Sequence, residues 1–175
     1  LFSEICDPTP ESLQGLANTT SIIKVRYISE PKLKNDSHLV MITHMTNAYL
    51  TVSGGCLVYD MIAEKLILAE NFAAETQLGT NPTNFDAHVQ IRWLPGEGNY
   101  GYVVTAGLKK VGLKELKSDP TPNDRRVLVC EVIGKFAERI WLEGKVPETV
   151  EIEAYGDLYV VSSKSGLSIT RKGPV

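Results

Sequence analysis

The sequence has few cysteines, no long hydrophobic run and no large excess of charge of one sign. Only three of its 175 residues are cysteine, and Lys plus Arg number 18 against 21 for Asp plus Glu, which gives a formal net charge of −3. No apolar run approaches the roughly 20 residues that span a bilayer, so we expect no membrane partner. Glycine has no fixed period and no heptad is sustained, which excludes collagen and a coiled coil.

Positive charge is scattered rather than gathered on one segment. A nucleic-acid-binding surface usually concentrates Lys and Arg on one face. Here Lys109 and Lys110 lie near Glu115, and Arg125 follows Asp124. Because this mixture is typical of a solvated surface, we expect no nucleic-acid partner.

The three cysteines, Cys6, Cys56 and Cys130, are far apart, odd in number and without a CxxC pair. A disulfide framework is therefore not expected, and reduced thiols favour a cytoplasmic location. Cys56 lies in a strand-like run and Cys130 on a periodic apolar face, so both are predicted to be small core residues.

Length and composition favour one domain. With 43% hydrophobic residues, a chain of this size removes about 70% of its unfolded surface from water. Residues 1–20 are rich in Pro, Ser, Thr and Glu, and we predict a linker or N-terminal extension there. Residues 21–175 are predicted to form a single α+β domain. Since the sequence starts at Leu1 rather than Met, we expect a segment of a longer chain.

Residues 37–53 are predicted to form the first main helix. Ser37 suits the N-cap and Gly54 the left-handed position after the last turn. The continuous apolar run at 39–42 leaves a strand as the alternative. Apolar residues recur here every three or four positions: Leu39, Ile42, Met45, Tyr49 and Val52.

Residues 124–143 are predicted to form the second main helix. Thr121 is the expected N-cap, Pro122 suits the first turn, and Gly144 ends the helix. Its apolar face is expected to lie on a sheet. This face comprises Val129, Cys130, Ile133, Phe136, Ala137, Ile140 and Trp141.

Short β-branched and apolar runs predict strands, most of them in hairpins. The segment 71–86 is expected to be a long loop, and 106–116 a helical turn followed by extended chain. His88 is expected on the solvent face of a strand. Together these elements predict an α+β fold, with a largely antiparallel sheet of six to nine strands covered by two main helices. The expected strands are 21–29, 56–60, 65–69, 87–94, 100–105, 150–154, 158–162 and 167–170.

The motifs of common chemistries are missing. There is no P-loop, no HExxH and no GxSxG, and Gly96-Glu97-Gly98 reads as a hairpin turn. We therefore predict no catalytic residue, no metal ligand and no cofactor. Glu148, Glu151 and Glu153 are interpreted as the solvent face of an edge strand rather than as paired catalytic carboxylates.

Three aromatic residues, Trp93, Tyr100 and Tyr102, gather around the hairpin of 87–105. Aromatic side chains either cover a sheet or anchor a partner. We predict these three as the binding residues for another protein or another domain of the same chain. Full burial of both Trp93 and Tyr100 would exclude that surface.

Two segments carry a resemblance to a known group of domains. Gly54–Asp60 (GGCLVYD) resembles the hairpin of certain bacterial α+β domains of unknown function, in which a glycine pair precedes an apolar strand and Asp. Thr105–Leu116 (TAGLKKVGLKEL) resembles their TxGLxxxGxPEL segment, with Lys114 at the proline position. The resemblance spans residues 53–144 and implies a bacterial intracellular interaction or immunity-like domain. It carries over no catalytic residue.

The sequence thus predicts a non-catalytic protein-interaction domain of an intracellular bacterial protein. One alternative is a hydrolase whose site combines His44, Asp60 and His88, with 71–86 as a lid. Another is a small-molecule-sensing domain with a pocket between helix and sheet.

Overall fold

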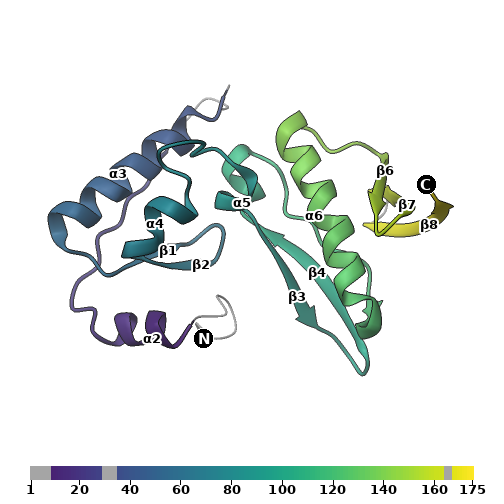
Figure 1. The fold of residues 1–175 in the computed structure, drawn as a ribbon, viewed down its shortest axis with the longest axis horizontal. Coiled ribbons are helices and arrows are strands. Elements are labelled where there is room, and N and C mark those ends of the chain that lie inside the picture. The colour runs from purple at the N-terminus through teal and green to yellow at the C-terminus, as the bar shows by residue number, and fades with distance from the viewer. Residues whose placement is uncertain (1–8, 29–34, 164–166) are drawn as a thin grey trace. The chain divides into compact units, whose positions relative to one another are not determined.

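The chain divides into two compact units, Leu1–His88 and Val89–Val175, each described here by itself. The structure is a computed structural model that describes residues 9–28, 35–163 and 167–175 (Figure 1). Five α-helices and eight strands are present in those residues, which confirms the α+β class. The strands do not form one sheet. They form three small sheets with antiparallel pairing, one of two strands and two of three strands.

The first unit holds most of the helices and the smallest sheet. Its two strands pair from Leu57↔Leu68 to Asp60↔Lys65, which confirms the predicted hairpin. Its elements are α2 (Pro10–Ala17), α3 (Ser37–Ser53), β1 (Leu57–Asp60), β2 (Lys65–Leu68), α4 (Ala69–Glu75) and α5 (Phe85–His88).

Helix α2 lies inside the predicted linker or N-terminal extension. Pro10 starts the helix, and Thr9 Oγ1 accepts a hydrogen bond from the backbone N–H of Ser12 at 3.2 Å. This is the side-chain capping that favours a helix start. A Cβ added at Gly15 would lie 3.2 Å from a methyl of Leu57, so α2 packs closely on β1.

The strand predicted at 21–29 is wrong over its described part. Residues 21–28 belong to no helix or strand, and Ser29 lies outside the described residues. Ile22 and Ile28 are largely exposed. A strand needs a partner strand to pair with as well as β-branched side chains. The sequence shows the β-branched side chains but not the partner strand.

Helix α3 confirms the helical interpretation of 37–53. The N-cap is Asp36 rather than Ser37, and its side chain makes no capping hydrogen bond. Gly54 has a φ of 63°, the left-handed conformation that ends a helix.

The expected loop at 71–86 is partly helical. Its start belongs to α4 and its end to α5. His88 ends α5 and is only 4% exposed, so its placement on the solvent face of a strand was wrong. The strand predicted at 87–94 from the alternating pattern begins only at Gln90.

The second unit contains one long helix and two three-stranded sheets, ordered β3-β4-β5 and β6-β7-β8. Its elements are β3 (Gln90–Pro95), β4 (Tyr100–Ala106), η1 (Leu108–Val111), β5 (Thr121–Pro122), η2 (Asn123–Arg125), α6 (Arg126–Glu143), β6 (Thr149–Ala154), β7 (Asp157–Ser162) and β8 (Ser168–Pro174).

Helix α6 packs against strands of both sheets of its unit and forms the centre of the core (Figure 1). The predicted face is correct except that Cys130 is only half-buried and Val132 is buried instead. Gly144 ends the helix as expected, with φ 67°. The expected start is wrong, because Thr121 and Pro122 pair with β4 and η2 precedes the helix.

The three C-terminal strands, expected at 150–154, 158–162 and 167–170, form an antiparallel meander. Tyr155 and Gly156 both have positive φ and make the β6–β7 turn. Residues 164–166, between the expected strands 158–162 and 167–170, lie outside the described residues. Glu151 and Glu153 are exposed while Val150 and Ile152 are buried, which confirms a solvent face on edge strand β6.

Candidate interaction surfaces

The hairpin β3–β4 has two different faces, and the three predicted binding residues do not share one. Trp93 pairs with Val103, whereas Tyr102 pairs with Leu94. Since paired residues point to the same side and neighbours alternate, Trp93 lies on the opposite face from Tyr100 and Tyr102.

The face that carries Trp93 points towards α6. Ile91 is on this face, and a Cβ added at Gly134 of α6 would lie 3.7 Å from the Ile91 side chain. Val103, also on this face, is fully buried. A Cβ added at Gly101 would lie 2.3 Å from the Trp93 ring, so the indole lies against bare backbone. Trp93 is half-buried and contributes mainly to packing on this side.

Tyr100 and Tyr102 lie on the face directed away from α6. Tyr100 is 51% exposed. Full burial of both Trp93 and Tyr100, which would exclude a binding surface on this hairpin, is therefore not observed. Lys117 Nζ lies 4.0 Å from the centroid of the Tyr102 ring, a cation–π contact that covers part of that ring. The two tyrosines therefore remain the predicted contact residues on this hairpin.

A larger apolar surface lies on α3, and the sequence analysis missed it. Met41, Met45, Tyr49 and Val52 are 42%, 41%, 46% and 86% exposed. Ala48 is also exposed and lies between them along the helix. Their spacing of three and four residues places all five on one side of α3. We call this set, Met41, Met45, Ala48, Tyr49 and Val52, the α3 outer face.

The other side of α3 is the one that packs on the unit. Leu39 and Thr43 are buried there, and Thr43 Oγ1 donates to the carbonyl of Leu39 at 2.8 Å. The seventeen residues of α3 include no Asp, Glu, Lys or Arg. A surface helix normally carries charged side chains outward. The lack of charge was the sequence signal for the α3 outer face, whereas the spacing of Met45, Tyr49 and Val52 was used only to predict the helix.

The residues of the alternative hydrolase site have local partners in the first unit. Asp60 Oδ1 accepts from the backbone N–H groups of Ile62 (3.1 Å) and Ala63 (3.0 Å), which shapes the β1–β2 turn. His88 Nε2 donates to the carbonyl of Pro82 at 2.7 Å. His44 is exposed on α3. Asp60 and His88 thus have structural partners within their own segment.

The cysteine predictions are correct only in part. Cys56 is exposed rather than in the core, and it lies one residue before the start of β1. Its Sγ lies 3.6 Å from the carbonyl oxygen of Gly15. Cys130 is half-buried, and burial raises the pKa of its thiol, with a smaller lowering by the charge of Arg126. No group of three or more potential metal ligands is present in the described parts of the chain.

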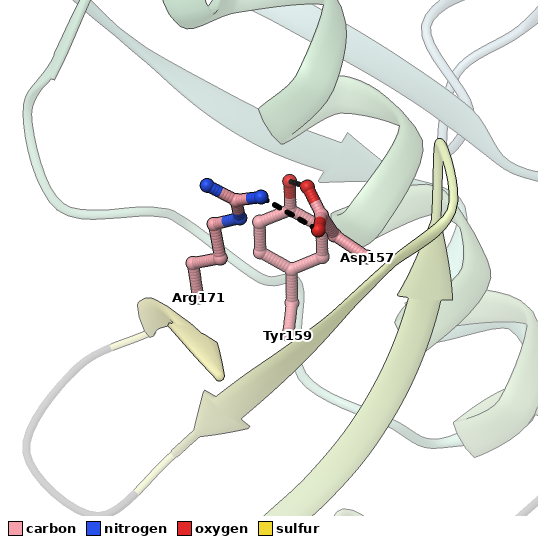
Figure 2. Close-up of polar contacts among 3 residues, drawn as sticks. All are labelled: Asp157, Tyr159 and Arg171. Carbon is pink, nitrogen blue, oxygen red and sulfur yellow. Dashed lines mark hydrogen bonds and ion pairs between the residues drawn. The ribbon is translucent and has the colours of Figure 1, made fainter. Parts of the chain in front are cut away.

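A polar cluster joins the last two strands (Figure 2). Arg171 Nη2 donates to Asp157 Oδ1 at 2.7 Å, and the Tyr159 hydroxyl lies 3.5 Å from Asp157 Oδ2. The hydrogen bond and the charge of Asp157 raise the pKa of the Arg171 guanidinium. Because Arg171 is largely exposed, solvent screens this pair and its contribution to stability is small. The cluster links β8 to β7.

The segment Thr105–Leu116 is organised around one carboxylate. Glu115 Oε1 accepts from the backbone N–H groups of Gly107 (3.0 Å) and Lys109 (3.2 Å). Glu115 Oε2 accepts from Thr105 Oγ1 (2.8 Å) and from the N–H of Leu108 (3.3 Å). By accepting these four hydrogen bonds, Glu115 fixes the shape of the loop that follows β4. The segment Thr105–Leu116 therefore has a structural explanation.

Comparison of the chain with protein-family models, with curated proteins and with solved structures gave no significant match. The resemblance to bacterial α+β domains therefore stays a prediction. Among the described residues, no helix is both long enough and apolar enough to cross a membrane.

Proposed function

We propose that this chain is a non-catalytic protein-interaction domain whose main contact is the α3 outer face. The observation that supports this proposal is a charge-free helix with four large apolar side chains in water. When a partner removes apolar surface from water, the complex is stabilised by about 25 cal/mol per Å² of that surface. Contiguous exposed apolar patches on a folded protein are typical of interaction sites.

The thin core of the first unit supports the same proposal. The largest fully buried side chains of the described residues all lie in the second unit, and they are Leu108, Val103, Val132, Ile133, Phe136, Ile140 and Val161. The first unit instead exposes large apolar residues in α2, in 21–28, in α3 and in the β1–β2 turn. A unit that buries little of its own apolar surface gains stability when a partner covers it.

The hairpin tyrosines provide a second, smaller contact in this proposal. The partner is another protein or another domain of the same chain. A cytoplasmic, bacterial setting belongs to the proposal as well. It is supported by the free thiols of Cys56 and Cys130 and by the resemblance of residues 53–144.

The test compares two variants of α3 that add the same charge. Met45→Glu places a carboxylate on the α3 outer face, whereas Thr51→Glu places it on an exposed position of α3 outside that face. Tagged wild-type and variant chains are used for quantitative affinity capture from extract of the source cells. We expect M45E to lose the captured partners and T51E to retain them. Equal capture by M45E and the wild type would reject the α3 outer face as the contact.

A further inference from the structure

Four of the five residues of the α3 outer face are placed symmetrically along the helix, while the counterpart of the fifth, Tyr49, is the exposed His44. Met41 and Val52, the two ends of the face, lie at equal sequence distances from the midpoint between Thr46 and Asn47. Met45 and Ala48 are likewise symmetric about that midpoint. Two copies of α3 placed antiparallel would therefore bring Met41 against Val52 and Met45 against Ala48, twice over. This is the condition for an isologous contact, in which residue i meets j and j meets i.

The charge pattern favours the same arrangement. Because α3 carries no Asp, Glu, Lys or Arg, two copies of the face meet without like charges opposing each other and without an unpaired buried charge. A strongly acidic or basic partner would find no complementary charge on this helix. Antiparallel packing also places opposite ends of the two helix dipoles side by side.

The side chains suit close helix packing. Ala48 is small and lies near the centre of the face, so two helices can approach to the usual 8–10 Å between axes. Met41 and Met45 are flexible and adapt to an apolar partner surface. Tyr49 adds a large, rigid contact with few rotatable bonds.

We infer that a second copy of this chain docks on the α3 outer face, through an antiparallel α3–α3 contact. This inference rests on the proposed function, since it names the partner of the same surface. The exposed parts of five side chains supply a few hundred Å² per copy, less than the roughly 800 Å² per partner of a standard interface. The dimer is therefore weak and reversible, and its population depends on protein concentration.

The test measures the mass of the full chain in solution by sedimentation over a concentration series. We expect the wild-type mass to rise with concentration towards that of two chains. M45E and Ala48→Lys each place an unpaired charge in the contact, so each variant alone is expected to keep the mass of one chain. Mixed together, the two variants pair the new carboxylate with the new ammonium, and the mass of two chains should return.

Matched controls separate this result from unfolding. Val52→Lys changes the most exposed residue of the face, where a positive charge suits the helix C-terminus, so the fold tolerates it. It should also remain a single chain, with the circular dichroism of the wild type. T51E, outside the face, should dimerise like the wild type.

Two outcomes would overturn the inference. The first is a wild-type chain that stays single at every concentration; loss of partner capture by M45E would then still support the proposed function with a different occupant. The second is dimerisation of M45E alone, or failure of the mixture of M45E and A48K to dimerise, because either result would place the contact elsewhere.

Discussion

Glu115 shows how much one side chain determines in the second unit. Both of its oxygens accept two hydrogen bonds each, and the donors come from the end of β4 and from η1. The Thr105 hydroxyl, which donates to Glu115, in turn accepts from the N–H of Leu116 at 2.8 Å. These bonds fix the chain around Gly107, whose φ of 125° is accessible to few residues other than glycine.

We predict that Glu115→Gln destabilises the fold by about 1–3 kcal/mol, because the amide group presents N–H donors to N–H donors and removes the charge. Urea unfolding followed by circular dichroism measures the change. The control is Glu138→Gln on the exposed side of α6, expected to stay within about 0.5 kcal/mol. Equal stability of E115Q and E138Q would contradict the structural role of Glu115.

At the scale of elements, α6 has one glycine within it and is followed by another, and only the second is required by its backbone conformation. Gly144 ends the helix with φ 67°, where a side chain is strained. Gly134 lies within the helix, and a Cβ there would make only an ordinary contact at 3.7 Å with Ile91. The same substitution should therefore have opposite effects at the two positions.

We predict that Gly134→Ala stabilises the protein by about 0.5–1 kcal/mol, through helix propensity, and that Gly144→Ala destabilises it by about 1 kcal/mol. Thermal unfolding of both variants beside the wild type measures the two shifts. If G134A lowers the melting temperature, the space beside Ile91 is smaller than the structure shows.

At the scale of the whole molecule, the two units differ in how well they are packed. The second unit surrounds α6 with two sheets and contains every one of the largest fully buried side chains of the described residues. The first unit has a two-stranded sheet, and such a hairpin is marginal without further cover. Stability is therefore expected to be unevenly distributed along the chain.

We predict that residues 89–175, expressed alone, fold cooperatively. A sigmoidal urea transition and dispersed amide NMR signals would show this. The control is the same fragment with Phe136→Ala, which should lose about 3–5 kcal/mol and with it most or all of the transition. An unfolded wild-type fragment would instead support the single domain predicted for 21–175, which stays a prediction until this measurement.

The sequence by itself determined the elements whose signals are local. Periodicity and terminal glycines predicted α3 and α6, and β-branched and apolar runs predicted the hairpins and the three C-terminal strands. The strong turn at 95–99 likewise predicted where β3 and β4 reverse. These features depend on a few neighbouring residues, so they can be read without knowledge of the rest of the chain.

Only the tertiary structure decided which surfaces are covered. Ser21–Ile28 has the residues of a strand but no neighbouring ladder, and Thr121 and Pro122 pair with β4 rather than cap α6. The apolar spacing of α3 is the same whether a face is buried or exposed, so it predicted the helix but not the exposure of Met45 and Tyr49. Trp93 and Tyr102 belong to the same hairpin, yet the strand register places them on opposite faces. Burial depends on contacts between distant segments, and one sequence read locally does not contain them.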